Sequence, residues 1–200
     1  MRVTILHRYF WPLEYPYAQM LKDIAETLTS EGHKVVILTT SDGTPGEKAL
    51  RESWAVEHDI AIRGLRLGTE KKYGLMRKAV SAFYFSVWGF CTLIFHKQEI
   101  VMVATTPPVI GAVMVRWASI VRGFNYIYHC QDIHPEGLLL TNHLKEGWLY
   151  RLLLKLDINN IEEAWRVITL SEDMKNTFRD RGCRVDHVHV INNFPFRDAG

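Results

Sequence analysis

The stretch Ile100–Gln131, IVMVATTPPVIGAVMVRWASIVRGFNYIYHCQ, decides the fold class. Its two ends, Ile100–Thr105 and Tyr126–Gln131, are short, largely apolar runs, as expected of parallel strands that are covered on both faces. The segment between them, Val109–Arg122, predicts a helix that stops near Gly123. A strand, a helix and a second strand in this order predict a β-α-β unit with parallel strands.

The same alternation extends outward to both ends of the chain. Further strands are predicted at Val3–His7, Val35–Thr40, Ile60–Leu67, Val167–Leu170 and Val188–Ile191. Further helices are predicted at Tyr17–Leu28, Tyr73–His96, Gly147–Ala164 and between Ser171 and Gly182, whereas residues 41–57 are predicted to form a polar loop. The sequence therefore predicts an α/β fold with a Rossmann-like, doubly wound, mostly parallel sheet of about seven strands.

The composition is that of a globular protein. Apolar residues make up 48% of the 200 residues and charged residues 23%. Lys and Arg (24) exceed Asp and Glu (22) by only two, so the net charge gives no support to a nucleic-acid partner. The cysteines Cys91, Cys130 and Cys183 match no zinc spacing and fit a reducing cytosol, and Met1–Leu6 has no signal-peptide pattern.

The loop after the first predicted strand, Arg8–Pro16, is the first candidate for a site, because sheets of this kind bind ligands at the carboxyl ends of their strands. It contains no glycine, which excludes the dinucleotide fingerprint and the P-loop and argues against an NAD-dependent dehydrogenase. Its aromatic residues and prolines favour either the wall of a cleft or a loop that packs over the sheet edge. Its candidate substrate-binding residues are Tyr9, Trp11 and Glu14.

Two threonines, Thr105 and Thr106, stand where the strand Ile100–Thr105 ends. They precede the pair Pro107-Pro108, and proline at a helix start is ordinary capping chemistry, which favours a structural role. Their hydroxyl groups are nevertheless expected to face the ligand edge. Thr105 and Thr106 are therefore also candidates for contact with a sugar or a phosphate.

The segment HCQDIHPE, residues 129–136, carries the densest cluster of ionisable side chains at a strand end. A hydroxyl nucleophile needs a group that accepts its proton, and a carboxylate or an imidazole suits that task. The candidate catalytic residues are Asp132, His134 and Glu136, and His129 is a candidate substrate-binding residue. Three alternatives stay open: Asp132 caps the next turn, Glu136 pairs with Arg151, or these side chains bind a metal, although their spacing matches no standard metal site.

Short motifs along the chain resemble those in the N-terminal domains of GT-B glycosyltransferases, specifically the large retaining family 4. The opening loop resembles the family's Tyr-Phe-x-Pro-Glu stretch, and the 132–136 segment is similar to the Asp-x-x-Pro-Glu motif of its bacterial polysaccharide branch. Each motif is weak alone, but they occur in the family's order over almost the whole chain: Tyr9–Glu14, Glu31–Val35, Thr105–Pro108, Asp132–Glu136, Ser171–Met174 and Val190–Pro195.

The resemblance implies two Rossmann-like domains that face each other across a cleft. Residues 1–190 would form the acceptor-side domain, without a cofactor or a metal of its own. Residues 191–200 would begin a linker to a C-terminal domain that binds the nucleotide-sugar donor, a UDP- or GDP-sugar. Asp132 occupies the position where many relatives place a group near the reacting sugar. Gln19, His134 and Asn192 depart from the family's pattern, so the acceptor does not follow, and we expect little or no transfer by this chain alone.

An apolar segment, Ala79–His96, has no formally charged side chain and lies at the lower length limit for spanning a bilayer. A buried core helix is the ordinary interpretation. The basic residues before it favour contact with anionic lipid instead: Lys71, Lys72, Arg77 and Lys78. We therefore expect a peripheral protein on the cytoplasmic face of the cell membrane that uses a lipid-linked saccharide as acceptor. The alternative is a non-catalytic, membrane-docking subunit of a split glycosyltransferase.

Overall fold

The seven predicted strands form one parallel sheet. The computed structural model describes residues 1–68, 75–141 and 144–193. In this part of the chain the strand order is β3-β2-β1-β4-β5-β6-β7, and every neighbouring pair is parallel. The strands are β1 (Arg2–Leu6), β2 (Lys34–Thr40), β3 (Ala61–Leu65), β4 (Ile100–Ala104), β5 (Asn125–Cys130), β6 (Arg166–Thr169) and β7 (Val188–Val190).

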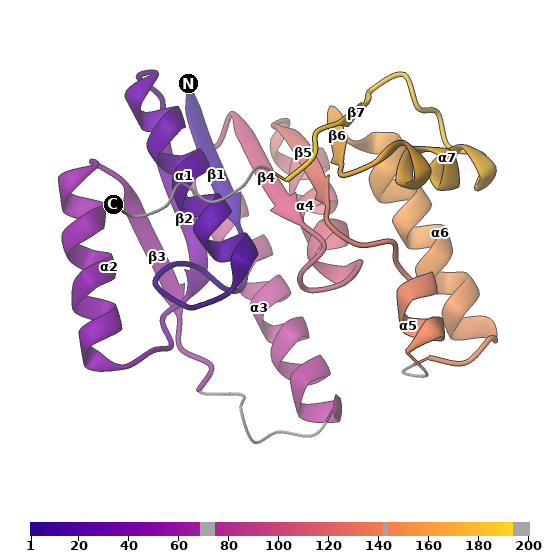
Figure 1. Cartoon of the computed structure of the whole chain (residues 1–200), viewed down its shortest axis with the longest axis horizontal. Coiled ribbons are helices and arrows are strands. Elements are labelled where there is room, and N and C mark those ends of the chain that lie inside the picture. The colour runs from indigo at the N-terminus through magenta and orange to yellow at the C-terminus, as the bar shows by residue number, and fades with distance from the viewer. Residues whose placement is uncertain (69–74, 142–143, 194–200) are drawn as a thin grey trace.

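Helices cover both faces of this sheet (Figure 1). They are α1 (Pro16–Ser30), α2 (Pro45–Glu57), α3 (Leu75–Phe95), α4 (Ile110–Arg122), α5 (Glu136–Leu140), α6 (Trp148–Glu163) and α7 (Glu172–Asp180). Successive strand residues point to opposite faces. Accordingly, Ile5 and Met102 share a core with residues of α1 and α2, whereas Leu6 and Val103 share a second core with residues of α3, α4 and α6. The prediction of a doubly wound α/β sheet is confirmed.

The chain reverses its direction of travel across the sheet at β1. This strand pairs with β2 on one side and with β4 on the other. All the strands are parallel, so their carboxyl ends share one edge, and open α/β sheets bind ligands where the strand order reverses. The loops after β1 and β4 lie at this switch point, and the loop after β5 lies next to them because β5 pairs with β4.

The prediction of a polar loop over residues 41–57 is wrong, because most of this segment is helix α2. Thr44 caps the helix: its hydroxyl accepts from the Glu47 amide, and the Glu47 carboxylate accepts from the Thr44 amide. Pro45 fits at the first helical position, where no amide hydrogen is needed. The ring of Trp54 then anchors the helix to the core at 5% exposure. The proline and glycines of this segment favour a loop in the sequence, but in the structure Pro45 begins the helix.

The remaining differences lie at element ends. The third strand ends at Leu65 and not at Leu67. The short helix α5, which the sequence does not predict, begins at the candidate catalytic residue Glu136. The glycine prediction at the end of α4 is confirmed, because Gly123 takes the left-handed conformation that ends a helix, with φ 71°. The predicted start of the long helix at Tyr73 lies outside the described residues.

Helix α3 is divided between core and surface. In its C-terminal half Phe85 and Leu93 are fully buried, and Gly89 lies against Leu6, where an added Cβ would be 3.1 Å from a Leu6 methyl carbon. Other positions on the helix are exposed: Met76, Phe83 and Tyr84 in its N-terminal half, and Phe95 at its end. The span Met76–Phe95 is long and apolar enough to cross a membrane by length and composition, but part of it (22%) is buried in the protein.

Candidate active site

The loops after β1, β4 and β5 meet at the switch point of the sheet. The Gln131 amide, just after β5, donates to the hydroxyl of Thr105, just after β4, at 3.3 Å. The Tyr17 hydroxyl in the first turn of α1 lies 2.9 Å from Nδ1 of His129 at the end of β5. These two bonds join segments that are far apart in the sequence and fix the three loops side by side.

A chain of buried polar side chains lies beneath this edge. His129 contacts the Tyr17 hydroxyl through Nδ1, and its Nε2 lies 2.7 Å from the side-chain amide nitrogen of Gln131. An amide nitrogen can only donate, so Nε2 accepts and Nδ1 carries the proton of a neutral ring. Burial, assisted by the nearby His7, lowers the pKa of His129 to about 4. Both ring nitrogens thus have protein partners, which favours a positioning role for His129 over direct contact with a substrate.

His7 and Tyr17 complete this buried chain. Their rings pack edge to face with centroids 4.8 Å apart, and burial lowers the pKa of His7 to about 4. His7 Nδ1 lies 2.6 Å from the Tyr9 carbonyl oxygen and 3.2 Å from the Tyr9 amide nitrogen, so the ring is bound to the start of the first loop. Sequence analysis did not identify Tyr17 or Gln131, because each had been assigned to a helix or a strand and not to a site.

Arg181, at the end of α7, holds the segment after β5. Its guanidinium donates from Nε to Glu136 Oε1 at 3.0 Å and from Nη1 to Asp157 Oδ2 at 2.8 Å. Its Nη2 donates to the His134 carbonyl oxygen at 2.9 Å and also to Glu136 Oε2. The alternative that Glu136 pairs with a nearby base is therefore confirmed, but the base is Arg181 and not Arg151. The pairing favours Glu136 as a residue that positions the loop.

Asp157 is the buried counterion of this arrangement. Its side chain is 4% exposed, it pairs with Arg181, and it accepts from the Tyr128 hydroxyl at 2.7 Å. Burial raises the pKa of the Asp157 carboxyl to about 6, against the opposing effect of its two hydrogen-bond partners. Neither Arg181 nor Asp157 was predicted, although a lone acid on the core side of an apolar helix is a signal that a buried partner exists.

Asp132 and His134 differ from these buried groups. Asp132 is exposed just beyond the end of β5. His134 is half-buried, and its Nδ1 is a buried atom without a hydrogen-bond partner among the described residues. Burial lowers the pKa of His134, with Asp132 and Glu136 acting in the opposite direction. A neutral imidazole and an exposed carboxylate two residues apart can each accept a proton or a hydrogen bond from a hydroxyl group.

The loop after β1 forms the walls of two cavities. One, of about 310 Å³, is lined by Tyr9 and Tyr15, and the other, of about 360 Å³, by Trp11, Glu14 and again Tyr15. The rings of Tyr9 and Tyr15 lie with centroids 4.8 Å apart. Trp11 also packs on Trp54, at 5.8 Å between centroids. The three candidate residues of this loop are thus brought to neighbouring cavities, and the loop does more than cover the sheet edge.

The turn between β4 and α4 is strained. Thr105 is buried and accepts from Gln131, whereas Thr106 is half-buried. Val109 has a φ of 57° and a ψ of −55°, and the Ile110 amide donates to the Pro108 carbonyl oxygen at 2.5 Å. This is a γ-turn with positive φ, a rare conformation for a branched residue. The buried side-chain amide of Asn160 donates to the Val109 carbonyl oxygen at 3.2 Å and helps to hold the turn.

Two further predictions concern metal and membrane. Among the described residues, no three His, Cys, Asp or Glu side chains gather as a metal site. Of the basic cluster, Lys71 and Lys72 lie outside the described residues, and Arg77 and Lys78 are exposed in the first turn of α3.

The chain belongs to the glycosyltransferase family 4-like domains. The family model "Glycosyl transferase 4-like domain" matches residues 17–193. A search of curated proteins by sequence gave no match. The family assignment favours a transferase over the non-catalytic alternative.

Solved structures of GT-B glycosyltransferases share the fold. Anabaena HepE in complex with UDP and glucose aligns over 96% of this chain and 44% of its own, with 18% identity and a TM-score of 0.59. Sucrose-phosphate synthase from Thermosynechococcus elongatus aligns over 96% and 48%, with 10% identity and a TM-score of 0.65. Arabidopsis thaliana UGT89C1 complexed with quercetin aligns over 98% and 51%, with 11% identity and a TM-score of 0.59. The chain therefore spans about half the length of these proteins.

Proposed function

We propose that this chain is the acceptor-binding half of a glycosyltransferase. A C-terminal domain would bind the nucleotide-sugar donor, a UDP- or GDP-sugar, and the cleft between the halves would lie at the carboxyl edge of the sheet. Two observations support the donor class: the family assignment, and the UDP that Anabaena HepE binds. The observation that carries the proposal is a pair of proton acceptors beside the switch point, Asp132 and His134, whose acceptor atoms have no hydrogen-bond partner among the described residues.

The proposed step is the attack of an acceptor hydroxyl on the anomeric carbon of the donor sugar. The new bond joins the acceptor oxygen to that carbon, the bond from the carbon to the phosphate oxygen breaks, and a nucleoside diphosphate leaves. Asp132, which is exposed at the edge of the proposed cleft, accepts the hydroxyl proton. If it only orients the hydroxyl by a hydrogen bond, the departing diphosphate takes the proton. Neutral His134 is the second acceptor, and Glu136 holds the loop through Arg181.

The aromatic loop after β1 supplies the acceptor subsite. Aromatic faces pack on the C–H faces of sugars, and Tyr15, which is 48% exposed, presents such a face between the two cavities. The Glu14 carboxylate, in the same loop, can accept hydrogen bonds from sugar hydroxyls. The Thr106 hydroxyl, just beyond β4 at the switch point, is a further group that can contact the sugar.

The catalytic role is tested in the enzyme that contains both halves. Asp132→Asn keeps the size of the side chain and removes its basicity, so we expect kcat to fall by about a hundredfold or more. Asp180→Asn, an exposed acid at the end of α7, is the matched control and should leave kcat unchanged. Near-normal turnover by the Asp132→Asn enzyme would refute the assignment.

The acceptor is proposed to be lipid-linked and the protein peripheral on the cytoplasmic face of the membrane. The support is the N-terminal half of α3, where Met76, Phe83 and Tyr84 are exposed next to the cationic Lys78. Apolar side chains beside basic ones favour the surface of anionic lipid.

Flotation with anionic and with neutral liposomes tests this. The chain should float only with anionic lipid, and Lys78→Glu combined with Phe83→Ser should reduce the floated fraction severalfold. Lys155→Glu on the exposed side of α6 controls for net charge. A wild-type chain that stays in solution with both lipids would remove the membrane proposal and leave the transfer proposal standing.

A further inference from the structure

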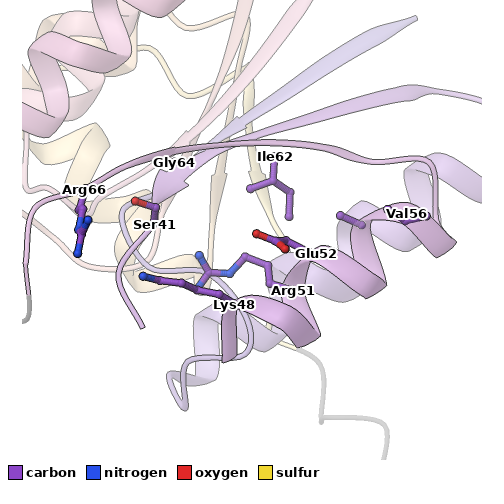
Figure 2. A pocket seen from close by; sticks show the side chains of 9 residues that line it. Ser41, Lys48, Arg51, Glu52, Val56, Ile62, Gly64 and Arg66 are labelled. Atoms are coloured by element: carbon purple, nitrogen blue, oxygen red, sulfur yellow. The ribbon is translucent and has the colours of Figure 1, made fainter. Parts of the chain in front are cut away.

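A cavity of about 500 Å³ lies between α2 and the edge strand β3, away from the candidate catalytic segment after β5 (Figure 2). Its cationic lining residues are Lys48, Arg51 and Arg66, and its one acidic lining residue is Glu52. Figure 2 shows Lys48 and Arg51 extending from α2 with their nitrogens towards the end of the cavity where Ser41 and Arg66 lie. The excess of positive charge is therefore gathered at one end.

The cations of this cavity are not neutralised by ion pairs. Within the described part of the chain, the side chains of Lys48 and Arg66 form no ion pair or hydrogen bond, and Lys48 is half-buried. Arg51 is 5% exposed and donates only to backbone carbonyls, those of Trp11 (2.9 Å), Thr40 (2.9 Å) and Asp42 (3.4 Å). A guanidinium carries five N–H groups, so two of them remain.

Two acids near Arg51, Asp42 and Glu47, are engaged elsewhere, whereas Glu52 shares the cavity with it. Asp42 and Glu47 line the neighbouring cavity of about 310 Å³. The Asp42 carboxylate accepts from the Gly68 amide at 2.9 Å, and the Glu47 carboxylate accepts from the Thr44 amide at 2.5 Å. Their carboxylates contribute negative potential at Arg51, but they do not line the cavity that Arg51 shares with Lys48.

The opposite end of the cavity is apolar. Helix α2 runs against the direction of the strands, so Ala55 and Val56 near its end lie far from the carboxyl edge where Lys48 lies. Ile62 lines this same end from the beginning of β3. The cavity therefore has a cationic end at the ligand edge of the sheet and an open, apolar end along α2, where Val56 is 84% exposed.

The wall of the cationic end is fixed by a close backbone approach. The Ser41 amide donates to the Leu65 carbonyl oxygen at 2.9 Å, and a Cβ added to Gly64 would lie 2.7 Å from that of Ser41. Only a glycine fits β3 at this position without displacing Ser41. The cationic end of the cavity is thus bordered by backbone that is hydrogen-bonded between Ser41 and Leu65.

We infer that this cavity binds a phosphate ester that carries an apolar chain, with the phosphate between Lys48, Arg51 and Arg66 and the chain along Ala55, Val56 and Ile62. Guanidinium groups bind phosphate oxygens through paired N–H donors, and three cations match a dianionic phosphate better than a single carboxylate. The ester is supplied either by a membrane lipid or by a soluble phosphate compound. The inference concerns binding alone and does not rest on the proposed transfer reaction.

Calorimetric titration of the 200-residue chain at low ionic strength tests the inference, with octyl phosphate, inorganic phosphate and uncharged octyl glucoside as probes. We expect octyl phosphate to bind at least about tenfold more tightly than inorganic phosphate, because the chain enters the apolar end. Octyl glucoside should not bind measurably. If inorganic phosphate binds as tightly as octyl phosphate, the ligand is a free phosphate and the apolar part of the inference is overturned.

Variants separate the two ends of the cavity. Lys48→Glu and Arg66→Glu should each weaken octyl phosphate binding by about tenfold, whereas Lys155→Glu makes the same change in net charge on α6 and should not. Val56→Gln alters a side chain that is 84% exposed, so folding is preserved, and it should reduce the advantage of octyl over inorganic phosphate. Equal binding by the wild type and both charge-reversal variants would overturn the site.

Discussion

Two buried arginines hold the two sides of the ligand edge in different ways. Arg181 fixes the segment after β5 through the carboxylates of Glu136 and Asp157. Arg51 fixes the loops after β1 and β2 through backbone carbonyls alone. The first guanidinium is neutralised by its partners and acts as scaffold, whereas the second keeps a charge available at a cavity wall. The comparison teaches that a buried cation is a candidate ligand group only when its counterions have not been supplied by the fold.

The largest expected effect comes from removing these arginines in turn. Arg181→Met leaves Asp157 buried without its ion pair and should lower the free energy of unfolding by about 3–5 kcal/mol. Arg51→Met leaves only carbonyl groups unpaired, so we expect a smaller loss of about 1–3 kcal/mol. Urea denaturation measures both, with Arg179→Met on the exposed side of α7 as control. Equal losses at the two arginines would break the comparison.

The pH dependence of stability should have opposite signs at His129 and Asp157. The pKa of His129 is about 4 in the folded chain against 6.5 ordinarily, so the unfolded chain binds more protons between these values. This imidazole therefore costs stability as the pH falls from 6.5 to 4, by up to about 3 kcal/mol. The pKa of Asp157 is raised from 3.8 to about 6, so its contribution is fully present below pH 3.8 and is lost as the pH rises through 6.

Unfolding followed between pH 4 and 7 in the wild type, His129→Asn and Asp157→Asn measures these two terms. Relative to the wild type, His129→Asn should lose less stability in acid, and Asp157→Asn should lose more. If the free energy of unfolding changed with pH in the same way in all three proteins, neither the lowered pKa of His129 nor the raised pKa of Asp157 would stand.

The smallest effect compares the two helix caps. Thr44 forms a reciprocal pair of bonds with Glu47, whereas Ser171 only accepts from the Met174 amide at 3.2 Å. Thr44→Ala and Ser171→Ala should each cost about 1 kcal/mol, with the larger loss at Thr44. Thermal unfolding monitored by circular dichroism can measure losses of this size. Thr44→Ser, which keeps the capping hydroxyl, is the conservative control. A larger loss at Ser171 would contradict the ranking of the two caps.

The fold could be predicted because its signals are local. The apolar runs and the glycine after α4 lie within one element each, so the period of the pattern and a single backbone conformation suffice to locate strands and a helix end. The prediction for residues 41–57 is wrong because Pro45 is equally suited to a turn and to a helix start. The capping bonds between Thr44 and Glu47 select the helix, and they exist only when the backbone has adopted that conformation.

The candidate site was predictable only in part, because its bonds are not local. Asp132, His134 and Glu136 follow a strand and could be found from that position. The partners that define them could not: Arg181 lies 45 residues from Glu136, and Tyr17 lies 112 residues from His129. Strand order brings these side chains together, and a hydrogen bond between a helix and a distant strand leaves no periodic trace in the sequence.

Val109 keeps the turn beyond β4 in a conformation that a glycine would adopt without cost. A branched residue with positive φ lowers the free energy of unfolding by about 1–3 kcal/mol. Burial of its side chain, here 1% exposed, raises it by roughly 1.5–3 kcal/mol. The two contributions nearly cancel, so we expect Val109→Gly, which removes both, to change the free energy of unfolding by little. What valine supplies is rigidity, since its isopropyl group is locked in the core and ties the hydroxyl-bearing turn to the helix behind it. A stretch of backbone can thus be held still without being made more stable.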